Sequence, residues 1–577
     1  MYEKLNKFEK VVFDILAVLL VVFYSYSAVL KPAATQYHRG IYVIITYMMI
    51  FLVYKAKNPI MRAVDYLLLV LSVFTVGYWI LNFEVISYRM GAETLFDQYV
   101  AVVGVLIGIE VARRVVGTVF VVVGGLMLAY GVYGAYMPDL IAHAGDTFPQ
   151  LCTSIFYKSD GVFGIMANVL ATYVILFVLF GAFLEASGAQ RFFIDFPLAA
   201  VGHKVGGPAK VSVIASGLFG SISGSAIANT VSTGMFTIPM MKKAGFRPHI
   251  AGGIEPAASI SGMFMPPIMG AGGFIMAELT GLPYSRIMLI AIFPAIMYVF
   301  SVFVMVHWEA KIHNIQGEKS EHSPWEILRK QWYYMLPLVG ITVLMLYGFS
   351  PGYSAIIGIF LCIIISWFRK DTRMDVKGFV KACRDGSEQS LKIGATVGVI
   401  GIIIGVLTYS GLVLTFADIV IELASGSLVL TILLIAFASL ILGMGVPVTA
   451  AYLITAVVAV PALVHLGVNE VAAHMIVYWL SQDSNITPPV CIAAFAGATI
   501  AKANMWRTAF ASFKFAKFLY MGPFLFGYVP AFSLDGTPMD IVIAFVLITI
   551  GTYLYAYVMS GHWFRYLKFG RKSVSVA

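Results

Sequence analysis

Charged residues are scarce in this chain of 577 residues. Asp, Glu, Lys and Arg together make up 12% of it, whereas a soluble globular chain carries about 25%. So few ionic groups cannot cover water-exposed domains of this total size. The composition therefore excludes a cytosolic enzyme, a disordered chain and a nucleic-acid-binding protein. Apolar residues are abundant instead: 60% of the chain is hydrophobic, with 42 Phe and 27 Met, which indicates closely packed helices in a membrane.

Cysteines and catalytic motifs are also scarce. The four cysteines have no CxxC spacing and no histidine cluster beside them, so we expect neither a disulfide framework nor a metal site. The chain has no G-x-x-x-x-G-K-[ST] phosphate loop, so ATP is not expected to drive it directly. It has no HExxH motif and no paired serine and base, which argues against an intramembrane enzyme. We expect no enzymatic activity and no cofactor apart from a coupling ion.

Long apolar runs fill most of the sequence. A helix needs about 20 apolar residues to cross a hydrocarbon core of roughly 30 Å. The first run is too long for a cleaved signal peptide and is expected to stay as a span. Two further runs, 248–280 and 472–501, are interrupted by prolines and glycines. The uninterrupted predicted spans are 11–30, 41–54, 64–82, 98–112, 115–136, 162–187, 286–308, 333–348, 354–368, 388–410, 518–534 and 541–560.

Basic residues in the loops predict the orientation of the chain, because Lys and Arg are enriched in cytoplasmic loops. Three lysines in the first ten residues, the basic loop 369–392 and the basic segment from Arg565 place both termini in the cytoplasm. Lys31 and Arg39 alone fall on the wrong side. The net charge of +9 is then a by-product of orientation rather than a binding face.

Two glycine-rich regions are each long enough for a re-entrant hairpin. The ends of 205–245 carry several Lys and Arg residues, so this hairpin is predicted to enter from the cytoplasm. The ends of 427–466 carry no Lys or Arg, so the second hairpin is predicted to enter from outside. The two hairpins therefore have opposite predicted orientations.

The sequence contains an internal repeat that agrees with these orientations. Pro239 and Pro461 are 222 residues apart, as are the Pro-Pro pairs that begin at Pro266 and Pro488. The Ser-Gly pair at Ser187 recurs 223 residues later. Because an odd number of crossings separates the halves, the repeat predicts inverted topology. Inverted repeats with discontinuous helices are typical of secondary transporters, which bind their substrate at the membrane midplane.

The predicted breaks and hairpin tips supply polar groups inside the membrane. A proline in a helix displaces the carbonyl four residues earlier, so the two Pro-Pro pairs should free carbonyls for a small cation. Helix N-termini at the hairpin tips can hold a carboxylate. Lining residues predicted to bind substrate are Ser221, Ser223, Ser225, Asn229, Gly445 and Thr449.

Acidic residues inside spans are costly, so each is a functional hypothesis by default. Glu255 precedes the first Pro-Pro break and Asp483 precedes the second. Each can ligate a cation, carry a coupling proton or form a structural pair. Glu110 lies beside Arg113 and Arg114, which predicts a structural ion pair at the membrane boundary instead.

The hairpin and break motifs resemble a known family. The segment 216–229, which reads SGLFGSISGSAIAN, followed by Ile238-Pro239, is similar to the first hairpin of the large membrane subunit of tripartite ATP-independent periplasmic (TRAP) transporters. The segments MPPI at 265–268 and GMGVPVTAAY at 443–452 look closest to the TAXI subgroup, in which the small and large membrane subunits are fused. The resemblance extends over nearly the whole chain.

The resemblance implies a fold and a function. The fold would be an all-α polytopic membrane protein, an elevator-type transporter with an inverted repeat and a fused four-helix N-terminal region. The function would be cation-driven import of small organic acids across the bacterial inner membrane, with a periplasmic substrate-binding protein of the TAXI type as partner. The implied regions are 1–114 (small-subunit-like scaffold), 115–160 (joining helix and external loop), 161–285 (first repeat), 286–387 (connecting spans and cytoplasmic loop), 388–505 (second repeat) and 506–577 (C-terminal scaffold).

One departure from the family pattern leaves the coupling ion open. Many members that carry dicarboxylates or sialic acid have an aspartate in each hairpin motif, where this chain has Asn229 and the stretch 446–449. Both Na⁺ and H⁺ are therefore retained, with Glu255 and Asp483 as proton carriers. The candidate coupling-cation residues are Ser225, Asn229, Ser261, Gly262, Met263, Met265, Pro266, Gly443, Asp483, Ser484, Asn485 and Thr487.

Two other functions are alternatives to a transporter that depends on a binding protein. A stand-alone elevator symporter for anions would need no binding protein, but the four-span N-terminal region argues against it. A channel would not need inverted hairpins.

Overall fold

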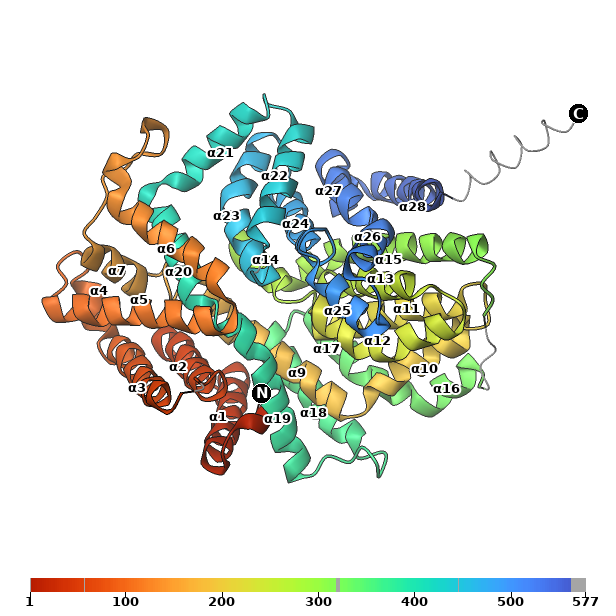
Figure 1. Ribbon diagram of the computed structural model, residues 1–577, viewed down its shortest axis with the longest axis horizontal. Helices are drawn as coiled ribbons and strands as arrows, with labels where there is room; N and C mark the ends of the chain where they lie inside the picture. Colours follow the sequence, from red (N-terminus) through yellow and green to blue (C-terminus); the bar gives the residue numbers. More distant parts are fainter. Residues whose placement is uncertain (1, 57, 318–321, 445, 562–577) are drawn as a thin grey trace, which may run out of the picture. The chain divides into compact units, whose positions relative to one another are not determined.

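The computed structural model describes residues 2–56, 58–317, 322–444 and 446–561, and every regular element in these ranges is a helix (Figure 1). Within the described residues, nine helical segments are long and apolar enough to cross a membrane. The protein is a multi-pass membrane protein. The nine segments are Lys7–Val29, Ile60–Leu81, Leu95–Val115, Thr118–Tyr136, Ile165–Ala186, Tyr284–Ile312, Val376–Ser410, Val448–His465 and Pro538–Ser560.

The chain forms two compact units, each built from several stretches of sequence. Unit 1 comprises the described residues of 1–187, 340–431 and 442–466. Its helices are α1 (Lys7–Val29), α2 (Thr35–Val53), α3 (Pro59–Leu81), α4 (Phe83–Tyr88), α5 (Leu95–Val115), α6 (Thr118–Tyr133), α7 (Phe148–Tyr157), α8 (Ile165–Val169), α9 (Ile175–Ala186), α18 (Pro351–Ser366), α19 (Val376–Gly394), α20 (Val397–Ser410), α21 (Leu412–Leu423) and α23 (Val448–His465).

Unit 2 comprises the described residues of 188–339, 432–441 and 467–577. Two helices, α17 (Leu336–Leu346) and α22 (Leu428–Leu442), are divided between the units. The helices within unit 2 are α10 (Ala189–Val201), α11 (Gly207–Ser223), α12 (Ala226–Lys243), α13 (Pro248–Ser259), α14 (Gly272–Thr280), α15 (Tyr284–Ile312), α16 (Pro324–Gln331), α24 (Glu470–Leu480), α25 (Ile492–Ala501), α26 (Met505–Phe515), α27 (Phe518–Tyr528) and α28 (Pro538–Ser560).

The two predicted hairpin regions each contain two helices, α11 and α12 in the first and α22 and α23 in the second. In the first region, α11 and α12 pack against each other and meet at Gly224 and Ser225. Gly224 has a φ of +57°, and a Cβ there would lie 2.7 Å from the Gly270 Cα, so only glycine fits this turn. The Ser225 hydroxyl then caps α12 by accepting from the Ala228 amide.

Residues 376–394 differ from the sequence prediction, which placed them largely in a cytoplasmic loop. They form α19, which packs against α9 and α1. Its buried positions, which recur every three or four residues, are Ala382, Cys383, Gly386, Ser387, Ser390, Leu391 and Gly394. The segment is an amphipathic helix: one face is buried, and its many basic residues belong to the polar face on the other side.

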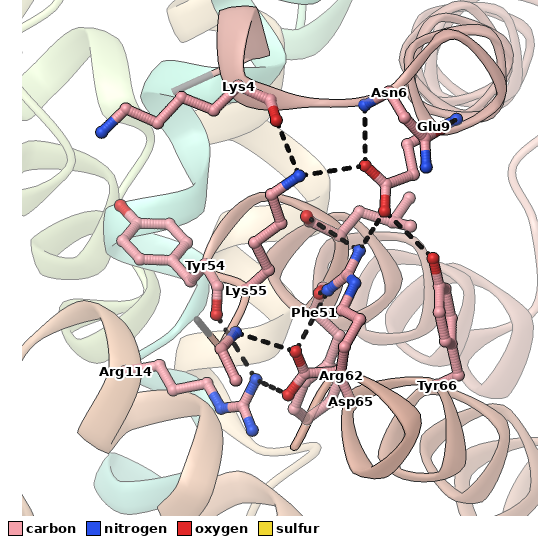
Figure 2. A network of polar contacts seen from close by, with 12 residues as sticks. Lys4, Asn6, Glu9, Phe51, Tyr54, Lys55, Arg62, Asp65, Tyr66 and Arg114 are labelled. Atoms are coloured by element: carbon pink, nitrogen blue, oxygen red, sulfur yellow. Dashed lines mark hydrogen bonds and ion pairs between the residues drawn. The ribbon is translucent and has the colours of Figure 1, made fainter. Parts of the chain in front are cut away.

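A network of ion pairs and hydrogen bonds joins the first three helices of unit 1 to α5 (Figure 2). Glu9 and Asp65 have side chains only 3% and 1% exposed. Arg62 donates to both of them, at 2.6 Å and 3.1 Å. Arg114 of α5 donates to the other Asp65 oxygen at 2.5 Å and to Glu110 at 2.7 Å. The predicted pairing of Glu110 with its two arginines is confirmed.

Further polar contacts hold the N-terminal helices to later parts of unit 1. Arg384 of α19 makes a bidentate pair with Asp14, at 2.8 Å and 2.9 Å. Arg39, an exception to the charge rule, donates to the Phe163 carbonyl at 2.7 Å and to Asn168 Oδ1 at 3.3 Å. These hydrogen bonds explain why an arginine stands at this position although the charge rule does not favour one there.

The buried part of the network should contribute strongly to stability. Arg62→Met leaves Glu9 and Asp65 each without one charged donor in a buried setting, and breaking a buried ion pair from one side costs about 3 kcal/mol or more. We expect the free energy of unfolding of the purified protein to fall by about this amount. Arg113→Met is the matched control, because the Arg113 side chain is 55% exposed and exposed pairs contribute less than about 1 kcal/mol. Equal losses in both variants would contradict the prediction.

Candidate functional site

Two broken helices lie within unit 2, at the positions where the sequence predicts them. The first runs from α13, which ends at Ser259, through a short 3-10 turn at Ile260–Met263, and resumes as α14 at Gly272. The second runs from α24, which ends at Leu480, through a 3-10 turn at Asp483–Asn485, and resumes as α25 at Ile492. Backbone of this kind is tolerated in a membrane only where protein or a cavity surrounds it.

The second break contains buried polar atoms without a hydrogen-bond partner among the described residues. These atoms are Gln482 Oε1, Asp483 Oδ1 and Asn485 Nδ2, from side chains that are 0%, 2% and 3% exposed. Because the O and N of an asparagine amide are assigned from their surroundings, Asn485 can also present its oxygen. These oxygens, one of them a carboxylate, are of the kind that a small hard cation prefers.

Hydroxyl groups adjoin this cluster. Thr487 hydrogen-bonds through its hydroxyl to the Tyr520 phenol of α27. Ser484 is buried in the same turn. The predicted residues Asp483, Ser484, Asn485 and Thr487 therefore stand in one short segment, and the structure adds Gln482 and Tyr520, which the sequence analysis missed.

The two breaks are joined by Tyr478, near the end of α24. Its phenol lies 2.5 Å from the Met263 carbonyl and 2.7 Å from the Met269 carbonyl, and both oxygens accept from it. The next residue, Trp479, stacks on Phe264 with ring centroids 4.4 Å apart. The Met263 carbonyl, predicted to be freed for a cation, thus already has one hydrogen-bond donor and one lone pair left.

Tyr478 should position the first break. Tyr478→Phe removes the donor from two buried carbonyls, and an unsatisfied buried acceptor costs about 1–3 kcal/mol. We expect a lower unfolding temperature and a higher concentration of coupling cation for half-maximal uptake. Tyr528→Phe is the control, because Tyr528 is 54% exposed. Wild-type cation dependence in Tyr478→Phe would contradict the positioning role.

Glu255 lies in a different environment from Asp483. It is fully buried on α13, where α11, α12 and α13 pack side by side (Figure 1). Ser216 and Thr233 donate to its Oε1, the former at 2.5 Å, and Ser212 and Thr237 donate to Oε2. The carboxylate is thus surrounded by hydroxyl groups from two neighbouring helices.

These hydroxyls leave no open position for a metal ion at Glu255. Each carboxylate oxygen accepts two short hydrogen bonds from side chains that are themselves held by packed helices. The arrangement ties three helices together and can take up a proton by rotation of a hydroxyl. Asp483 Oδ1, in contrast, has no donor among the described residues.

Asn229 of α12 connects the neighbouring helices α11 and α13 through its side-chain amide. Its Nδ2 donates to the carbonyls of Ser216 at 2.8 Å and Ser259 at 3.3 Å. Close packing at glycines accompanies this contact, because a Cβ on Gly262 would lie 2.4 Å from the Gly220 Cα. Gly262 therefore allows the first break to approach α11.

The remaining predicted residues of unit 2 lie along the hairpin tip and the first break. Ser221 donates to the Leu218 carbonyl within α11, and Ser261 donates to the Ala258 carbonyl. The Ser223 hydroxyl is buried and has no partner among the described residues. Met265 and Pro266 are half-buried after the 3-10 turn.

Two predicted residues belong to unit 1 instead. Gly443 follows α22, and Thr449 lies in the first turn of α23 with a buried hydroxyl that has no partner among the described residues. Gly445 lies outside the described residues.

Interrupted apolar helices around buried acidic and hydroxyl groups are typical of helical membrane transporters. A family model described as "Tripartite ATP-independent periplasmic transporter, DctM component" matches residues 103–532. The chain belongs to this family of TRAP transporter permeases. The match begins after residue 102, so α1 to α4 and the first part of α5 lie outside it.

Curated relatives agree with this family. The chain is 23% identical to the C4-dicarboxylate TRAP transporter large permease protein DctM of Pseudomonas aeruginosa, over 66% of this chain and 91% of the relative. It is 22% identical to the sialic acid TRAP transporter large permease protein SiaM of Vibrio cholerae, over 59% and 80%. It is 24% identical to the sialic acid TRAP transporter permease protein SiaT of Haemophilus influenzae, over 56% and 52%.

One solved structure, that of the YdaH transporter of Alcanivorax borkumensis, aligns with a TM-score of 0.48 and 17% identity, over 72% of this chain and 98% of that one.

Proposed function

We propose that this protein is the membrane permease of a secondary transporter that imports small organic acids and depends on a soluble binding protein. It works as a carrier and not as an enzyme. The family and its curated relatives for C4-dicarboxylates and sialic acid support the substrate class. A cation gradient, of Na⁺ or H⁺, supplies the energy.

The observation that carries the coupling proposal is the unpartnered Asp483 carboxylate oxygen in the second break. A buried charge without a partner is strongly destabilising, so a site that retains one is suited to a cation that binds and leaves. Gln482, Asn485 and the hydroxyl of Thr487 supply further oxygens within five residues. Glu255 is the alternative proton carrier, because its hydroxyl shell accommodates a proton but no metal ion.

We further propose that residues 1–114 act as a fused small subunit and form a fixed scaffold. The ion pair of Asp14 with Arg384 supports this, because it joins the N-terminal region to a later part of unit 1, while the pair of Asp65 with Arg114 holds the region together. The transport part carries both hairpins and both breaks as inverted repeats and moves as an elevator. The soluble partner is a periplasmic protein of the TAXI type, and both termini lie in the cytoplasm of a bacterial inner membrane.

Uptake into proteoliposomes tests the proposal. The purified permease is reconstituted into liposomes, and its purified binding protein and a candidate organic acid are added outside. A Na⁺ gradient or a H⁺ gradient is then imposed, one at a time. We expect accumulation under one gradient and none without the binding protein. Accumulation without any soluble partner would favour the stand-alone symporter, and unitary currents in a planar bilayer would replace the carrier by a channel.

A further inference from the structure

A buried lysine near the beginning of α11 has no carboxylate partner among the described residues. Lys210 is 4% exposed, and its ammonium donates to His307 Nδ1 of α15 at 3.0 Å. It also lies 5.1 Å from the centroid of the Phe303 ring. An ammonium has three N–H donors, and among the described residues His307 accepts only one of them. A buried positive charge whose partner is neutral is destabilising, and a bound anion would neutralise it.

Two more lysines share this end of unit 2. Lys204 precedes α11, and Lys311 lies one helical turn after His307 on α15. Both are exposed, and both lie close enough to Lys210 for their charges to act on it. No ion pair joins any of the three to a carboxylate of the described residues. The result is a concentration of positive charge on one face.

Tight packing fixes the position of this charge. The Gly206 amide donates to the Ile315 carbonyl at 3.0 Å. A Cβ on Gly206 would lie 2.6 Å from the Ala310 Cβ, so the loop before α11 presses directly on the last turns of α15. The contact between Lys210 and His307 is therefore held in place by close packing of the backbone segments around it.

An acidic residue on the same turns of α15 is paired with basic residues that lie outside this helix. Glu309 pairs with Lys514 at 2.6 Å and with His313 at 3.3 Å. Among the described residues, no carboxylate pairs with Lys204, Lys210 or Lys311, whereas the adjacent Glu309 pairs with two basic residues.

We propose that Lys204, Lys210 and Lys311 bind a phosphate group at the end of α11 and α15. The charge pattern of the sequence predicts that this end faces the cytoplasm, and basic pockets between helices on that side bind anionic lipid headgroups. A phospholipid headgroup and a soluble phosphate have the same chemistry here, and the experiment below separates them. The site is independent of the proposed transport function.

The test uses the full-length protein, purified and delipidated in a neutral detergent. Native mass spectrometry measures the occupancy of added phosphatidylglycerol, phosphatidylcholine and inorganic phosphate. The variant Lys204→Gln/Lys311→Gln changes only exposed residues and should fold normally. Lys210→Gln is the second variant, and Lys330→Gln is the control because Lys330 is exposed and pairs with Glu326.

We expect wild type and Lys330→Gln to retain phosphatidylglycerol and to bind phosphatidylcholine much more weakly. The double variant should bind phosphatidylglycerol about 30-fold more weakly, since each of the two lysines contributes about 1 kcal/mol to the attraction of an anionic headgroup. Competition by millimolar phosphate would identify soluble phosphate as the occupant, and its failure to compete would identify the lipid. Equal binding of both lipids, binding of neither lipid nor phosphate, or wild-type affinity in the double variant would overturn the proposal.

Discussion

Asp483→Asn is expected to abolish cation-dependent uptake while leaving the protein folded. The substitution keeps the shape of a side chain that is 2% exposed, and it removes a negative charge that no described residue neutralises. A cation bound there would lose its charged ligand in a buried site, which costs about 3–5 kcal/mol. The affinity for the coupling cation should therefore fall by about 100-fold or more.

Two measurements check this prediction. Uptake at increasing cation concentration gives the apparent affinity, and thermal unfolding in detergent shows whether the fold is kept. Asp535→Asn is the matched control, because Asp535 is an exposed aspartate of the same unit. Uptake of Asp483→Asn at the wild-type rate and cation affinity would remove Asp483 from the coupling site.

Glu255→Leu is expected to have the opposite profile, with a large loss of stability. Four hydroxyls from α11 and α12 lose their common acceptor in a dry interior. Thr233 can still donate to the Asn229 carbonyl at 2.7 Å, but Ser212 makes no other hydrogen bond within the described residues. A buried group left unsatisfied costs about 1–3 kcal/mol, and the other hydroxyls lose smaller amounts. We therefore expect the free energy of unfolding to fall by about 3 kcal/mol or more.

Glu255→Gln separates the structural role from proton transfer. Its amide oxygen can accept from Ser216 and Thr233, and its NH₂ can donate to Ser212 and Thr237 after their hydroxyls rotate. We expect this variant to unfold close to the wild-type temperature and to transport if Glu255 is only a brace. A folded Glu255→Gln protein that no longer responds to a proton gradient would make Glu255 the proton carrier.

The sequence predicted the breaks well because their causes are local. Pro266-Pro267 and Pro488-Pro489 cannot continue a helix, and the structure interrupts both helices there. The turn at Gly224 is local in the same way. The hydroxyl shell of Glu255 carried a readable signal that was missed: Ser212 and Ser216, Thr233 and Thr237, and Glu255 and Ser259 are each four residues apart on an apolar helix. This spacing puts each pair on one helix face.

Other features could not be predicted, since they depend on contacts between distant segments. Tyr478 and Met263 are 215 residues apart, yet one hydrogen bond joins them. Nothing near Tyr478 in the sequence distinguishes it from an ordinary apolar-helix tyrosine. Charge dominates the composition of 376–394, so the sequence predicts a loop there, whereas packing against α9 and α1 favours a helix.

The sequence by itself determined that the chain lies in a membrane, where its helices break and which two acids stand beside the breaks. Composition, proline and charge act through local chemistry, so they can be read one segment at a time. Only the tertiary structure decided that the two acids differ. Hydroxyls from neighbouring helices saturate Glu255, while Asp483 Oδ1 has no donor among the described residues. Packing brings those donors to one carboxylate and not to the other.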